Sequence, residues 1–157
     1  MEAFSVKECS DYGLVKELFL EYAGMKGAES CFVSFEKEIG DLAAFYSGGA
    51  LLVGYEGDAP AGCIAIRRLD ADRCEAKRLY IRPAYRGKGY ARLMLGAMLD
   101  KAGELGFREV SFTTKPSVMQ IAYGLYQRMG FEEIAEEDGI VEMSKSIRHE
   151  EEKERLG

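Results

Sequence analysis

The sequence contains a single histidine, no CxxC pair and no long apolar run. Its only histidine, His149, lies near an acidic end of the chain, so neither a zinc site nor a histidine-based catalytic pair is expected. The cysteines show no CxxC spacing and are typical of small buried hydrophobic residues: Cys9, Cys31, Cys63 and Cys74. No apolar run approaches the ~20 residues of a membrane span, and residues 1–3 do not open a signal peptide. We therefore expect a cytoplasmic protein with no metal and no membrane partner.

Positive charge is also in deficit, because the formal net charge of the 157 residues is -6. This balance disfavours nucleic acid as a partner and mildly favours a cationic acceptor such as an amine. The length suits one domain, and neither a repeat nor a linker divides it. We expect a single domain over residues 1–147 and a charged tail over 148–157. The sequence leaves a homodimer open.

Against this acidic background, glycines and cations gather between a strand and a helix. Residues 74–81 suit a strand, which Pro83 ends, and residues 86–91 suit a turn in which Gly87 and Gly89 permit unusual backbone angles. A long helix should follow at once. Its apolar face is expected to hold Ala91, Leu95, Met98, Ala102 and Leu105.

The start of that helix is a candidate site for an anion. The first backbone N–H groups of a helix lack partners and carry partial positive charge, and glycines let an anion come close. Four cations lie here, namely Arg82, Arg86, Lys88 and Arg92. They favour a bound polyanion, most simply a pyrophosphate, over a solvated basic helix start. The turn is neither a Walker loop, which needs Lys followed by Ser or Thr, nor a Rossmann turn, which needs a third glycine.

What does fit is the pattern Arg86-x-x-Gly89-x-Ala91. It resembles the acetyl-CoA pyrophosphate signature of the GNAT (GCN5-related N-acetyltransferase) family. A second segment, Ala122-x-x-Leu125-Tyr126-x-x-x-Gly130-Phe131, looks like the family's later helix and its exit into a strand. The run from Lys77 to Pro83 also resembles the corresponding segment of many members of the family. Together these matches cover about residues 74 to 131.

The order of elements predicts an α/β fold with a mixed sheet and helices on both faces. The resemblance implies a single-domain GNAT fold, mostly antiparallel, whose fourth and fifth strands splay apart and admit the cofactor. The expected strands are 4–8, 50–56, 61–68, 74–81, 109–114, 131–134 and 140–146. The first expected helix begins after Ser10 or Asp11, and the second spans residues 35–45. The third begins at residue 91, and the fourth runs from Pro116-Ser117 to residue 129. A hairpin turn is expected over 57–60.

The resemblance further implies acetyl-CoA as co-substrate and an amine acceptor, on a small molecule, peptide or protein. The cofactor-binding residues it implies are Leu79, Tyr80, Ile81, Arg86, Gly87, Lys88, Gly89, Tyr90, Ala91, Arg92 and Ala122. Among these, main-chain N–H groups near Leu79 to Ile81 would stabilise the oxyanion.

Two residues are candidates for proton transfer. Glu75, in the fourth strand, is the candidate base for the amine, and the alternative is a surface carboxylate paired with Lys77 or Lys115. Tyr126 is the candidate acid for the departing thiolate, and the alternative is a core tyrosine.

Aromatic residues of the first half of the chain are candidates for the wall of an acceptor site, although a plain core is the alternative for most of them. They are Phe19, Tyr22, Phe32, Phe35, Phe45 and Tyr46.

Two residues of the later helix depart from expectation. Met119 stands where many GNAT members carry an Asn, which puts one contact to the pantetheine arm in doubt. Gly124 inside that helix either makes room for the cofactor or is a tolerated fault.

No cysteine or serine sits in a recognisable nucleophile setting, which favours direct acetyl transfer to the amine. The alternative from another class is an acyl-CoA-binding sensor of the same fold without turnover. A generic phosphate-binding module is the weakest alternative, and it predicts no preference for CoA over ADP.

Overall fold

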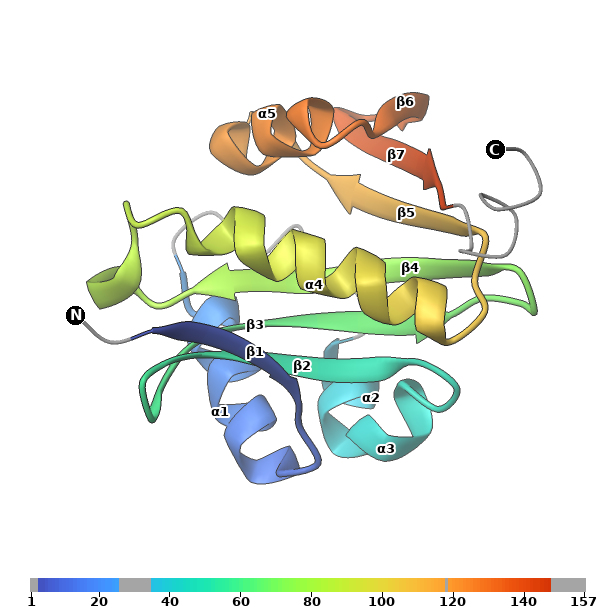
Figure 1. The fold of residues 1–157 in the computed structure, drawn as a ribbon. Helices are drawn as coiled ribbons and strands as arrows, with labels where there is room; N and C mark the ends of the chain where they lie inside the picture. Colours follow the sequence, from blue (N-terminus) through green and yellow to red (C-terminus); the bar gives the residue numbers. More distant parts are fainter. Residues whose placement is uncertain (1–2, 26–34, 118, 148–157) are drawn as a thin grey trace, which may run out of the picture.

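The computed structural model describes residues 3–25, 35–117 and 119–147, which build one seven-stranded sheet (Figure 1). The strand order is β1-β2-β3-β4-β5-β7-β6, and neighbours are antiparallel except β4 and β5, which run parallel. The strands are β1 (Phe4–Glu8), β2 (Ala50–Glu56), β3 (Ala59–Arg68), β4 (Arg73–Ile81), β5 (Glu109–Thr114), β6 (Glu132–Glu137) and β7 (Ile140–Ser146). The predicted mixed, mostly antiparallel α/β sheet is confirmed.

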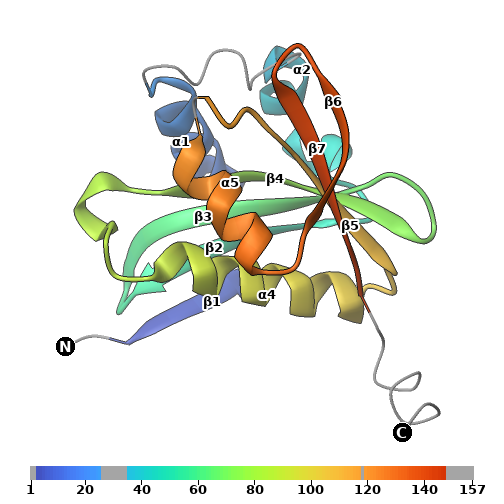
Figure 2. The ribbon, with the colours of Figure 1, turned by 90° about the horizontal axis from the view of Figure 1, so that it is seen from above.

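Helices cover both faces of the sheet (Figures 1 and 2). The helices are α1 (Tyr12–Ala23), α2 (Phe35–Gly40), α3 (Leu42–Phe45), α4 (Tyr90–Glu104) and α5 (Gln120–Arg128). The larger apolar core lies under α4 and α5 and includes Leu95, Met98 and Phe112. A second core under α1 and α3 includes Leu18, Phe19 and Leu42. We call the two sides of the sheet the α4 face and the α1 face.

The first helix shows how local sequence chemistry sets an element. Asp11 caps α1, because its Oδ1 accepts a hydrogen bond from the Leu14 N–H at 3.2 Å. Val15, Leu18 and Phe19 then fall on the buried face at helical spacing, and Gly24 follows the last helical residue. The cap predicted at Ser10 or Asp11 is confirmed at Asp11.

One predicted helix is in fact two. Residues 35–45 divide into α2 and α3, and Asp41 lies between them. Its Oδ1 accepts a hydrogen bond from the Ala44 N–H at 3.1 Å, so the side chain caps a new helix instead of continuing the old one. Short polar side chains compete for backbone hydrogen bonds in this way and favour caps over helix interiors.

Other predicted boundaries shift, and strand β6 spans Glu132–Glu137 instead of 131–134. The helix expected to open at Pro116-Ser117 begins at Gln120, after the Met119 N–H has closed a turn onto the Lys115 carbonyl at 2.8 Å. Strand β3 begins at Ala59, so the preceding hairpin turn is only Gly57-Asp58. Helix α4 begins at Tyr90, one residue early, and the expected core residue Leu105 lies exposed just past its end.

The central strands β4 and β5 pair over only a short stretch. They pair only where Arg73–Glu75 lies beside Glu109–Ser111, although both strands continue beyond this point. Figure 1 shows β5 diverging from β4, while β5 stays paired with β7 along its length. The predicted splay of the fourth and fifth strands is therefore confirmed, and it opens beyond Glu75.

Candidate active site

The turn between β4 and α4 has the conformation that its glycines predict. After a 3₁₀ helix over Pro83–Tyr85, Gly87 has φ +80° and Gly89, the N-cap of α4, has φ +82°. A Cβ built on either glycine would meet no heavy atom within 4 Å. Glycine is therefore needed for the backbone angles and not for packing, and the space beside the turn is open.

The backbone amides of this turn are available to a ligand. Within the described chain, no N–H group from Gly87 to Arg92 donates a hydrogen bond, and the first such donor in α4 is Leu93, to the Gly89 carbonyl at 3.4 Å. The positive end of the helix dipole lies at the same place. The segment predicted to hold a pyrophosphate is therefore not closed by neighbouring residues of the described chain.

The cations around the turn divide into two groups. Arg82 is held by carboxylates of α1, donating to Glu17 at 2.8 Å and to Glu21 at 3.2 Å. Arg86 and Arg92 are exposed and have no carboxylate partner among the described residues. The Arg86 Nε donates instead to the Ile81 carbonyl at 2.9 Å, which ties the turn to the end of β4. Arg82 thus does not face outward with the other cations, contrary to the sequence interpretation.

Lys88 and Tyr90 are anchored by Glu56, which the sequence did not reveal. The Lys88 Nζ lies 2.8 Å from Glu56 Oε2, and the Tyr90 hydroxyl donates to the same oxygen at 2.5 Å. These two donors lower the pKa of the Glu56 carboxyl. The ring of Tyr90 also stacks on Phe4, with centroids 4.0 Å apart. Strands β1 and β2 therefore hold the turn from one side.

Glu75 lies at the point where the central gap opens. It is the last residue of β4 that pairs with β5, opposite Ser111. Its Oε1 lies 3.6 Å from the Lys77 Nζ, and the Thr113 hydroxyl donates to its Oε2 at 3.5 Å. Its neighbours Cys74 and Ala76 lie in the larger core, so Glu75 points to the α1 face. The alternative interpretation of Glu75, a surface carboxylate paired with Lys77, expected this contact. The role of Glu75 as a base stays a prediction.

Tyr126 lies on the other face of the sheet. It is 5% exposed, and its ring stacks on Phe112 of β5 with centroids 4.1 Å apart and an interplanar angle of 13°. Ala122, one helical turn earlier in α5, also packs against the larger core. The structure thus places Glu75 and Tyr126 on opposite faces of the sheet, each beside the strands that splay. The acid role of Tyr126 stays a prediction.

Strand β4 is interrupted by a bulge at Arg78. Lys77 pairs with Ala65 and Tyr80 pairs with Cys63, so that Ile64 lies opposite both Arg78 and Leu79. After this bulge, Leu79 and Ile81 pack against the larger core, while Tyr80 turns to the α1 face. The main chain of Leu79 to Ile81, predicted to stabilise an oxyanion, lies beyond the last residue that pairs with β5.

Tyr80 is tied to α1. Its ring stacks on Tyr22 with centroids 5.2 Å apart, and its hydroxyl donates to Glu21 at 2.9 Å. Burial, followed by the hydrogen bond to Glu21, raises the pKa of Tyr80 to about 12. The side chain therefore stays neutral and serves to fix the strand against the helix.

The aromatic residues expected as candidates for an acceptor wall are mostly structural where they are described. Phe19 and Tyr46 are buried in the second core with their rings edge to face. Phe45 instead carries Arg67 over its ring, 4.2 Å from the centroid. Tyr22 and Phe35 are only partly buried, and Phe32 lies outside the described residues.

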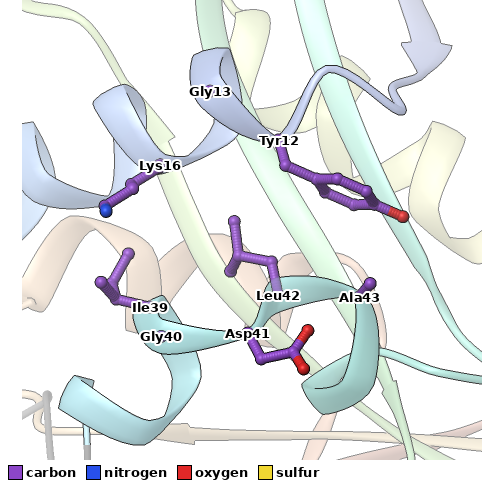
Figure 3. Close-up of a pocket in the computed structure, with 8 residues that line it drawn as sticks. All are labelled: Tyr12, Gly13, Lys16, Ile39, Gly40, Asp41, Leu42 and Ala43. Atoms are coloured by element: carbon purple, nitrogen blue, oxygen red, sulfur yellow. The ribbon is translucent and has the colours of Figure 1, made fainter.

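A shallow hollow elsewhere involves none of the predicted site residues. Figure 3 shows it between the start of α1 on one side and the α2–α3 connection on the other. Its lining residues are Tyr12, Gly13, Lys16, Ile39, Gly40, Asp41, Leu42 and Ala43. The candidate site is therefore the turn and the gap, not this hollow.

Neither a metal cluster nor a membrane-spanning helix occurs in the described part of the chain. Across 3–25, 35–117 and 119–147, no three or more His, Cys, Asp or Glu side chains gather as they would around a metal ion. In the same ranges, no helix is long and apolar enough to cross a membrane.

The sequence of this chain is similar to sequences of known proteins. The model of the Acetyltransferase (GNAT) family matches residues 14–131. YjgM of Escherichia coli, an uncharacterised N-acetyltransferase, is 33% identical over 85 residues, which are 53% of this chain and 50% of that protein. An uncharacterised N-acetyltransferase of Schizosaccharomyces pombe is 28% identical over 131 residues, covering 81% of this chain and 80% of that protein. The chain thus spans about half the length of the E. coli relative.

Solved structures share the fold. An acetyltransferase of Streptococcus agalactiae superimposes with a TM-score of 0.76 at 16% identity, over 94% of this chain and 100% of that one. The yncA protein of Salmonella typhimurium, solved with its cofactor acetyl-CoA, gives 0.72 at 18% identity, over 93% and 95%. The PaiA N-acetyltransferase of Thermoplasma acidophilum, solved with coenzyme A, gives 0.71 at 18% identity, over 92% and 99%.

Proposed function

The chain belongs to the GNAT acetyltransferase family, and from this premise we propose that it transfers an acetyl group from acetyl-CoA directly to a primary amine. One observation carries the proposal. The amides of Gly87 to Arg92 make no hydrogen bond within the described chain, and the space beside Gly87 and Gly89 is open. This turn follows β4, and beyond Glu75 that strand pairs with no residue of β5 in the described chain. Support comes also from the neighbours that contain acetyl-CoA or CoA.

The residues of the turn fit a diphosphate. Two glycines allow close approach of the amides, and Arg86 and Arg92 supply positive charge without a carboxylate to neutralise it in the described chain. Lys88 contributes less, because Glu56 already holds it. Acetyl-CoA, when bound, supplies the activated acetyl group as a thioester.

The chain's own groups meet the remaining demands of the chemistry. The main chain of Leu79 to Ile81 donates to the carbonyl oxygen as negative charge develops there. Glu75, on the α1 face, takes the proton that the amine must lose. Tyr126, on the α4 face, holds the proton that the departing thiolate needs. Acid and base thus serve opposite faces of the gap and do not compete for one proton.

Direct transfer is favoured over an intermediate on Cys63 or Cys74. Cys63 and Cys74 are both buried, and burial raises the pKa of the Cys74 thiol to about 12. Burial raises the pKa of Cys63 as well. Because the thiolate is the nucleophile, thiols held in the protonated form are poor candidates for carrying an acetyl group.

Binding is tested by calorimetry with CoA and with ADP. We expect CoA to bind more tightly than ADP, since its pantetheine arm would add contacts along the part of β4 that does not pair with β5. Equal affinities would favour a generic phosphate module, and no heat with either ligand would end the proposal.

Turnover is tested by thiol release from acetyl-CoA with a panel of polyamines, amino acids, aminoglycosides and short peptides. Glu75→Gln and Tyr126→Phe are each expected to lower kcat on the order of a hundredfold. Glu109→Gln on β5 and Tyr123→Phe on α5 are the matched controls and should retain it. Unchanged kcat in both test variants would remove the catalytic assignments, and binding without turnover of any amine would favour a sensor.

A further inference from the structure

Arg78 occupies a backbone conformation that rarely suits a large side chain. Its φ is +63°, and bulges with a left-handed residue usually contain glycine there. Asp138, the other non-glycine residue with positive φ in the described chain, lies in the turn between β6 and β7, where aspartate is common. Arg78 has no turn to explain it. Contacts from outside the strand must therefore hold its conformation.

A carboxylate from α2 supplies such a contact. The Arg78 Nε donates to Glu38 Oε2 at 2.9 Å and one terminal nitrogen donates to Oε1 at 2.6 Å. The Tyr46 hydroxyl donates to Oε2 at 2.7 Å, and Glu38 is completely buried. Burial, followed by the charge and hydrogen bond of Glu38, raises the pKa of Tyr46, so it stays a neutral donor. A two-point contact between buried charges fixes direction as well as distance.

The bulge decides which way the rest of β4 faces. Ala76 lies in the larger core, so in a regular strand Arg78 and Tyr80 would follow it there. Instead Leu79 and Ile81 take those positions. The Arg78 carbonyl accepts a hydrogen bond from the Cys63 thiol at 3.4 Å. Because a trans peptide is planar, the Leu79 N–H points away from that carbonyl. The bulge thus sets the direction of the main-chain groups beside the gap.

We infer that Arg78 is a positioning residue for acetyl transfer: its ion pair with Glu38 holds the β4 bulge and thereby aims the main chain of Leu79 to Ile81 into the gap. Arg78 itself touches no reacting atom and acts through the backbone of its own strand. The inference rests on the proposed function, because this main chain matters to catalysis only when the acetyl group lies in the gap.

The first test is Arg78→Lys, which keeps the charge beside Glu38 but loses the planar two-point donor. With acetyl-CoA and the fastest amine of the panel, kcat per folded molecule is expected to fall on the order of tenfold or more. The Kd for CoA should change by less than about twofold, since the diphosphate amides lie in the following turn. Deuterium exchange of the Leu79 to Ile81 amides should quicken. Arg73→Lys, an exposed change in the same strand, is the matched control and should alter none of these.

The second test separates the bulge from the ion pair. In a Glu38→Gln background, Arg78→Gly and Arg78→Ala both lack the ion pair, but only glycine accepts the left-handed conformation without strain. The glycine variant is expected to keep a kcat on the order of tenfold above the alanine variant. This comparison holds even where Arg78→Lys fails to fold.

The outcomes are distinct. Unchanged kcat in Arg78→Lys, with only a lower free energy of unfolding, would make the pair purely structural and overturn the inference. Equal kcat in the glycine and alanine variants, or loss of kcat and of CoA affinity by the same factor, would also overturn it. If the unaltered chain binds no CoA, the proposed function fails and the inference fails with it. Equal kcat in the unaltered chain and in every variant removes the inference alone.

Discussion

The sharpest test of the anion site is Gly89→Ala compared with Gly106→Ala. These glycines lie at the two ends of α4, Gly89 as its N-cap with φ +82° and Gly106 just past its C-terminus with φ +94°. A Cβ added to either would meet no heavy atom within 4 Å. The two substitutions therefore impose the same kind of backbone strain without a clash, and they differ only in which end of the helix they alter.

The expected magnitudes follow from this match. A left-handed conformation costs an L-residue about 1–2 kcal/mol, so each variant should lose about that much free energy of unfolding. Only Gly89→Ala places a methyl group beside the amides of Gly87 to Arg92, which make no hydrogen bond to a described residue. Its affinity for CoA should therefore fall on the order of tenfold, or about 1.4 kcal/mol, while Gly106→Ala should bind as the unaltered chain does.

Two measurements decide the matter. Urea denaturation gives the stability loss of each variant, and calorimetry at a temperature where both are folded gives the Kd for CoA. Equal stability losses with unchanged CoA affinity in both variants would refute the assignment of the diphosphate to this turn. An equal loss of affinity in both would show that the effect comes from general destabilisation of α4.

Three further predictions concern α5 and the neutral side chain Tyr80. Gly124→Ala should raise the free energy of unfolding by about 0.5–1 kcal/mol, because an added Cβ meets only the Arg128 guanidinium, at 3.3 Å. Urea denaturation checks this, and the Kd for acetyl-CoA shows whether the glycine also makes room for the cofactor. Met119→Asn should raise the free energy of unfolding by about 1 kcal/mol in the same assay, because Met119 is an N-cap whose side chain makes no capping hydrogen bond. An unchanged free energy of unfolding would contradict the N-cap position. Tyr80 has a pKa of about 12, so the stability from its neutral form should be complete below pH ~10 and lost as the pH rises towards 12. The difference between absorbance titrations of the unaltered chain and of Tyr80→Phe should show no tyrosine that ionises near pH ~10. A tyrosine signal near pH ~10 in that difference would contradict the Glu21 contact.

The features predictable from sequence depend on neighbours along the chain. Asp11 caps α1 through an N–H three residues away, and Gly87 and Gly89 take positive φ in the turn before α4. Turn and cap chemistry of this kind is local, so a short stretch of residues determines it. For the same reason the open turn that we propose as the anion site could be predicted from the order of residues alone. Local reasoning also failed in places, and the division at Asp41 arose because a capping side chain was read as part of a helix interior.

The rest was decided by tertiary structure. Glu56 reaches Lys88 across 32 residues, and Glu38 reaches Arg78 across 40. The sequence alone grouped four cations at the turn, yet Arg82 turns to α1 and Lys88 is paired with Glu56. Likewise, β4 could be predicted as a strand but not as a bulged one, because a bulge depends on register with β3 and on what lies across each face. Pairings between distant segments depend on packing in three dimensions, which determines which charges remain for a ligand.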